Sequence, residues 1–159
     1  MASLKLFVLL ALVALTLAYP IPTKKDEKDF YDVLPAEIKQ FWQELTDSDI
    51  AVLHKLKAQL KTANDDASYD IIKAESASLA DRLKAMYTGI YTKVDKLSAA
   101  PKKYLTDLIH SVEHIDAANA NEWFDKLEKV VNAAGKPAQA VQDEIVKVFP
   151  TLKDFWFGM

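Results

Sequence analysis

The sequence contains no cysteine and only three glycines in 159 residues. Without cysteine, no disulfide can hold the fold together and no thiolate can act as a nucleophile. The few glycines form no glycine-rich loop that could bind phosphate. Lysines and acidic residues alternate along the chain, whose net charge is −3, so no basic patch suited to nucleic acid is present. The stability of the fold must therefore come from apolar packing.

Long apolar runs are scarce as well, and the longest covers residues 6–17. It follows Lys5 and ends at the small residues Thr16 and Ala18, which is the pattern of a cleaved secretion signal. It is shorter than the roughly 20 residues of a membrane-spanning helix, although a retained anchor is the alternative interpretation. We therefore expect residues 1–18 to be a signal peptide and the mature protein to be secreted and extracellular.

Removal of this signal would leave 141 residues, a length that fits one domain. Their net charge is −4, because cleavage removes Lys5 and no acidic residue. Residues 19–30 contain two prolines followed by charged side chains, which predicts a flexible leader. We expect the helical domain to cover residues 31–159.

From Tyr31 onward the apolar residues recur at helical spacing and do not alternate as they do in strands. Helices are predicted over residues 35–45, 67–74 and 78–97, and around the apolar residues of 50–60, 104–115, 123–131 and 141–149. The predicted fold class is all-α, an irregular bundle of about six to eight amphipathic helices. Their unequal lengths favour an interior space, and a fully packed helical domain is the alternative.

The longest predicted helix carries a continuous apolar stripe on one face. The stripe consists of Leu79, Leu83, Met86, Ile90, Val94 and Leu97. Helix ends are marked too, since Thr46 and Asp49 match a capping box and Gly135 can end a helix in the left-handed conformation. Ser98 and either Asn119 or Asn121 are further candidate caps.

Four segments follow one another in an order that is informative as a whole. They are LPAEIKQFW at 34–42 followed by Leu45-Thr46-x-x-Asp49, the segment 66–79 with YDIIKA at 69–74, VDKLS at 94–98, and FPTL at 149–152. Their order and spacing resemble those of the nematode fatty-acid- and retinol-binding proteins. The resemblance covers residues 31–157, and it lies in the order of the segments because each motif alone is common.

The resemblance implies a secreted, non-enzymatic carrier that needs no cofactor and binds fatty acids and retinol in an internal apolar cavity. The expected cavity lining consists of Phe41, Leu53, Leu56, Leu79, Leu83, Met86, Ile90, Val94, Leu105, Leu108, Val112, Leu127, Val131 and Ile145. A secreted helical protein that binds a protein partner and no lipid is the alternative.

Ligand binding of this kind would be dominated by the tail. Each buried methylene contributes about 0.8 kcal/mol, so a chain of roughly 16 contributes about 13 kcal/mol before costs. A partly exposed ion pair to the head group adds only about 0–1 kcal/mol. We therefore expect acids and alcohols both to bind, with selection mainly by chain length.

The candidate head-group residues are Arg82, Tyr87 and Lys93, on the two flanks of the apolar stripe. Arg82 is the only arginine, and neither it nor Lys93 has an acidic residue three or four positions away. A guanidinium beside apolar side chains suits a bidentate carboxylate contact. Alternatively, Arg82 pairs with an acidic residue of another helix or extends into solvent.

A remote enzymatic alternative comes from His110, Glu113 and His114, which match the H-x-x-E-H pattern of inverted zinc peptidases. Helical spacing places both histidines opposite the apolar face of their helix, where they would be solvated. No distinctive third ligand follows in the sequence, so we expect no metal site here.

Two further residues or segments have two interpretations each. Thr46 fits a helix cap, and Thr-x-x-Asp also fits an acid-directed kinase, a site that the family resemblance places here. The terminal residues Phe155, Trp156 and Phe157 either dock onto the core or contact a membrane transiently during ligand exchange.

Overall fold

All regular structure in the described part of the chain is helical, as the sequence predicts. The computed structural model describes residues 25–63, 65–113, 115 and 120–156. The elements are α2 (Lys25–Val33), α3 (Ala36–Gln43), α4 (Asp47–Thr62), α5 (Asp65–Glu75), α6 (Ala77–Val94), α7 (Ala99–Glu113), α8 (Ala120–Ala134), α9 (Gln139–Val148) and the 3₁₀ helix η1 (Pro150–Trp156). The predicted signal peptide and residues 19–24 lie outside the described ranges. Among the helices that are described, none combines the length and apolar character needed to cross a membrane.

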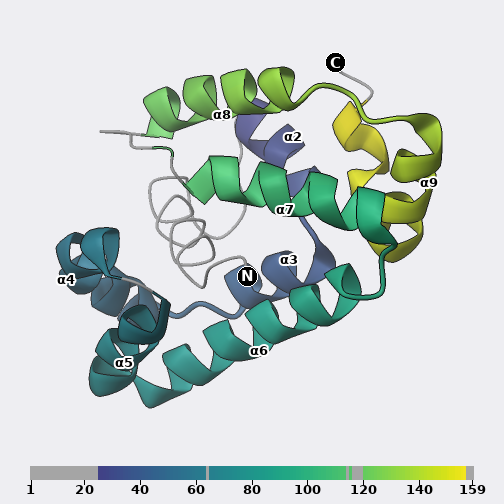
Figure 1. The fold of residues 1–159 in the computed structure, drawn as a ribbon. Coiled ribbons are helices and arrows are strands. Elements are labelled where there is room, and N and C mark those ends of the chain that lie inside the picture. The colour runs from purple at the N-terminus through teal and green to yellow at the C-terminus, as the bar shows by residue number, and fades with distance from the viewer. Residues whose placement is uncertain (1–24, 64, 114, 116–119, 157–159) are drawn as a thin grey trace.

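The helices pack in two groups. In the first group, α5 packs against both α4 and α6, and α3 packs against α6. In the second group, α7 packs against α8 and α9, and η1 packs against α9 and α2. Figure 1 shows α4 and α5 as a hairpin at one end of α6, with α7 and α8 on the far side of α3.

Local sequence signals explain several helix ends. Thr46 caps α4 in a full capping box, because its hydroxyl accepts from the Asp49 amide while the Asp49 carboxylate accepts from the Thr46 amide. Ser76 caps α6 by accepting from the amide of Leu79. Gly135, which follows α8, has φ 68°, a conformation in which glycine carries no steric penalty. The predicted cap and the predicted left-handed glycine are both confirmed.

The prediction of a flexible leader up to residue 30 is wrong for residues 25–30, because these belong to helix α2. The segment contains no proline or glycine, and Lys28 forms an ion pair with Asp32 one turn later. Tyr31 also ties α2 to α3, because its hydroxyl accepts from Gln43 at 2.9 Å and its ring meets Trp42 edge-on at 5.6 Å. Sequence periodicity alone misses this helix because it is short and strongly charged.

The remaining differences are shifts of helix ends. Helix α6 stops at Val94 instead of residue 97, although Leu97 is still buried. Asn121 lies inside α8 and so is not its cap, and Asn119 lies outside the described residues. The hydroxyl and amide of Ser98, before α7, both bind the Glu144 carboxylate of α9.

Apart from Val131 of α8, the buried apolar side chains of the described residues form one connected core. Near the α4–α5 hairpin, the side chains of Leu53, Leu60, Ile72 and Leu79 are fully buried in it. The core continues along the apolar face of α6 to Ile145 and Phe149 at the opposite end. The stripe predicted from the sequence is therefore part of this common core.

Candidate functional site

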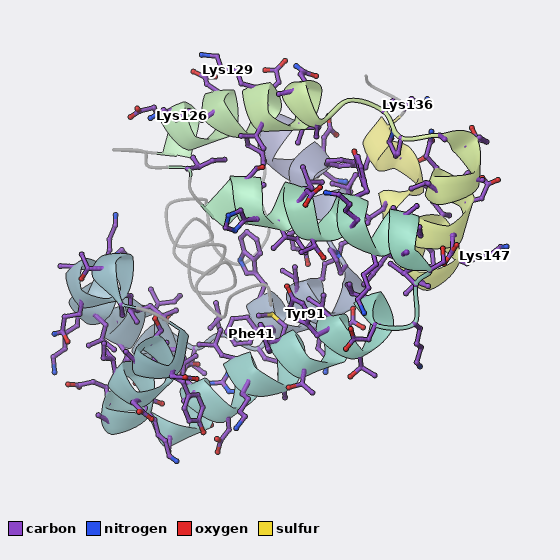
Figure 2. The ribbon with its side chains drawn as sticks, viewed as in Figure 1. Phe41, Tyr91, Lys126, Lys129, Lys136 and Lys147 are labelled. Atoms are coloured by element: carbon purple, nitrogen blue, oxygen red, sulfur yellow. The ribbon has the colours of Figure 1, made fainter. Side chains whose placement is uncertain are left out.

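The apolar interior contains most of the side chains expected to line a cavity. Eleven of them are buried, and Leu108, Val112 and Leu127 are half-buried. They come from α3, α4, α6, α7, α8 and α9, so only α2, α5 and η1 of the described helices contribute none. Figure 2 shows Phe41 and Tyr91 near the place where α3 meets α6.

Arg82 is not free to bind a ligand carboxylate, because it pairs with an acidic residue of another helix. This is the second of the two interpretations of its sequence context. Its Nη2 lies 2.7 Å from Oδ1 of Asp49 on α4. Its Nη1 donates to the Glu44 carbonyl at 2.9 Å, and its Nε donates to the Ser78 carbonyl at 3.4 Å. The guanidinium thus joins α6 to the start of α4.

Asp49 completes this junction with its second oxygen. Oδ2 accepts from both the amide and the hydroxyl of Thr46, each at 2.9 Å. Burial of the carboxyl, whose side chain is 7% exposed, acts to raise its pKa. The hydrogen bonds from Arg82 and Thr46 outweigh burial, so the pKa of Asp49 lies below its ordinary value.

Lys93, the second candidate cation, forms an ion pair with Glu37 of α3. Its ammonium also lies 5.7 Å from the centroid of the Phe149 ring, a cation–π distance. The other carboxylate oxygen of Glu37, Oε2, is buried and has no hydrogen-bond partner within the described residues. Gly89 lies beside this pair, and a Cβ there would be 3.5 Å from Cγ of Glu37.

Tyr87, the third candidate, packs partly buried against the core, and its ring lies 4.6 Å from that of Tyr91. The three candidates therefore do not converge on one point. Arg82 binds at the start of α4, whereas Lys93 contacts Glu37 of α3 and the ring of Phe149, which follows α9. Which of these side chains contact a ligand remains a prediction.

Two residues that matter here were not proposed from the sequence as partners of the cations. Glu37 has no cation three or four positions away on α3, and Lys93 has no acidic residue at those positions on α6. Opposite charges that are both unpartnered on their own helices are a usable signal for a pair between helices. Asp49 was not identified as the partner of Arg82 because the sequence already assigned it to the Thr46 cap.

In the part of the chain that the structure describes, no metal site is found around the histidine motif. No three His, Asp or Glu side chains gather there in a way that could hold a metal ion. His110 is exposed on α7, His114 lies outside the described residues, and the side chain of Glu113 is not described.

At the C-terminus, Phe155 is half-buried and packs against the core together with Leu152. This packing agrees with the interpretation that Phe155 docks onto the core. Phe157 lies outside the described residues, as does the side chain of Trp156.

Comparison with known proteins gives one consistent result. The family model described as nematode fatty acid retinoid binding protein matches residues 28–157. Fatty-acid and retinol-binding protein 1 of Wuchereria bancrofti is 26% identical over 130 residues, which cover 80% of this chain and 72% of the relative. The protein of the same name from Loa loa is 23% identical over 141 residues, covering 86% and 79%. No solved structure matches the chain significantly.

The Asp49 junction leads to a prediction about pH. A carboxyl group whose pKa is lowered by folding stabilises the native state above its unfolded pKa of about 3.9, and this contribution is lost as the pH falls through the folded value. We expect Asp49→Asn to lower the free energy of unfolding by about 1–3 kcal/mol at pH 7. The difference from wild type should shrink steadily below about pH 4.

Urea unfolding of both proteins between pH 7 and pH 2.5 measures this difference. Asp125→Asn, at an exposed position of α8, is the matched control and should differ little from wild type throughout. A gap between wild type and Asp49→Asn that stays constant down to pH 2.5 would contradict the assignment.

Proposed function

Because the chain belongs to the nematode fatty acid retinoid binding protein family, we propose that it is a secreted, non-catalytic carrier of fatty acids and retinol. The observation that carries the proposal is the single apolar core shared by two helix groups, in a chain with no disulfide to lock them together. The signal-like residues 1–18 support export.

The ligand tail would lie in the apolar interior between the two groups. The middle of the α6 face, with Met86, Ile90 and Val94, is the central part of that site, together with Phe41 of α3 and Leu105 of α7. The end formed by α4 and α5 is closely packed around Leu53 and Ile72, so it serves better as a fixed support. Separation of the groups along α6 would admit the tail without breaking a covalent bond.

The proposed head-group residues are Arg82, Tyr87 and Lys93, and their contacts rank them. Arg82 would have to give up three acceptors, one of them a carboxylate, which makes it the costliest to recruit. Lys93 forms an ion pair with Glu37 and lies next to the central stripe residues Ile90 and Val94. The Lys93 end of the site is therefore the better position for a head group.

Ligand capture tests the proposal directly. Protein purified from its expression host without detergent should retain fatty acid, which native mass spectrometry would detect as a mass increase on the folded protein. A fluorescent fatty acid should shift its emission to shorter wavelength on mixing and should be displaced by oleate and by retinol. Bound lipid should also raise the melting temperature, because it binds only the folded state.

A protein that carries no lipid and leaves the probe unchanged would contradict the carrier function. That result would favour the alternative of a secreted helical protein that binds a protein partner.

Thr46 is also proposed as a phosphorylation site for an acid-directed kinase. Incubation with such a kinase should add one phosphate to wild type and none to Thr46→Ala. The modified hydroxyl could no longer donate to Asp49, so phosphorylation should cost about 0.5–2 kcal/mol of stability, similar to the loss caused by Thr46→Ala. A Thr46→Ala variant that still takes up the phosphate would contradict the assignment.

Transient membrane contact is proposed for Trp156 and Phe157. The double variant Trp156→Ser and Phe157→Ser should keep the melting temperature of wild type while transferring a fluorescent fatty acid to phospholipid vesicles more slowly. Phe155→Ala is the control, because loss of a packed side chain should lower the melting temperature. Equal transfer rates for the double variant and wild type would rule out the contact.

A further inference from the structure

The two oxygens of the Glu37 carboxylate have different environments. Oε1 is ion-paired with the Lys93 ammonium, whereas Oε2 is buried and receives no hydrogen bond from any described residue. The Glu37 side chain as a whole is only 21% exposed. A buried acceptor without a donor is unfavourable, and a charged acceptor more so than a neutral one.

The position of this oxygen relates it to the proposed ligand site. Glu37 lies one helical turn before Phe41 on α3, so the two side chains project from the same side of that helix. Lys93 lies one turn after Gly89 and next to Val94 on α6. Cγ of Glu37 lies against α6 at Gly89, where a Cβ would be in ordinary van der Waals contact with it at 3.5 Å. Glu37 thus reaches the same α3–α6 contact that supplies the central apolar residues.

The chemistry of Oε2 selects one kind of head group. An ionised carboxylate only accepts hydrogen bonds, so its natural partner is a donor such as a hydroxyl. A fatty-acid carboxylate has no proton to donate near neutral pH and carries the same charge as Glu37. The charge of Lys93, which would otherwise attract that carboxylate, is already balanced by Glu37.

We propose that Glu37 determines head-group specificity, with Oε2 accepting the hydroxyl hydrogen of an alcohol ligand such as retinol or a fatty alcohol and disfavouring a carboxylate. Lys93 is then a positioning residue, which holds Glu37 through Oε1 while its ammonium rests on the Phe149 ring. The inference rests on the proposed carrier function and adds a preference to the dominant contribution of the tail.

The first experiment uses wild-type protein and three ligands that share one 18-carbon chain with a single double bond: oleyl alcohol, its methyl ether and oleate. Competition against a bound fluorescent fatty acid gives the three dissociation constants. The ether can accept a hydrogen bond but cannot donate one. We expect it to bind roughly tenfold more weakly than the alcohol, as loss of a hydrogen bond to a charged acceptor implies. Equal binding of ether and alcohol would overturn the proposal.

The second experiment uses Glu37→Gln, which keeps the size of the side chain and removes its charge. Lys93 then has no carboxylate partner on α3 and can attract that of oleate. We expect the ratio of the oleate and oleyl alcohol dissociation constants to fall by roughly tenfold or more. Glu128→Gln, at an exposed position of α8, is the matched control and should leave the ratio unchanged.

The outcomes separate the inference from the function on which it rests. If wild type binds none of the ligands, the carrier function itself fails. If wild type binds them and Glu37→Gln weakens alcohol and acid equally, Glu37 is only structural and the inference is wrong. If Glu37→Gln does not fold by circular dichroism, the comparison of alcohol and ether on wild type decides alone.

Discussion

Burial of one face of α6 is the constraint on which the rest of the structure depends. Each fully buried leucine on that face contributes about 1.5–3 kcal/mol, and no covalent cross-link supplements this term. Helices α5 and α3 pack against α6, and side chains of the second helix group extend the same core. A change that exposed this face would therefore open the core that the two groups share.

The polar contacts of α6 follow from this constraint. Near its start, Arg82 joins the helix to the capped beginning of α4 through Asp49. Near its end, Lys93 joins it to Glu37 on α3 and to the ring of Phe149 beyond α9. Both ties flank the apolar stripe, so they orient α6 without interrupting its core face. In the first tie both oxygens of Asp49 accept hydrogen bonds, whereas the second leaves one buried oxygen of Glu37 without a donor among the described residues.

Interactions between residues that are close in sequence made much of the fold predictable. Helical periodicity identified the stripe from Leu79 to Val94, and hydrogen-bonding chemistry identified the Thr46 cap and the turn at Gly135. The helix from Lys25 was missed because charged residues hide its short apolar face, which gains a partner only when Tyr31 meets Trp42. Pairing of Arg82 with an acidic residue of another helix was one of the two interpretations, but its partner Asp49 was not identified, and the Glu37–Lys93 pair was missed. Each pair joins residues far apart in sequence, and the packing of helices decides which charges meet.

The contact between α2 and η1 brings together the beginning and the end of the described chain. Such a pairing closes a loop that includes nearly every other described helix, so it can form only after those helices have been synthesised. In a chain without disulfides, the two ends of the described chain are therefore held together by packing alone.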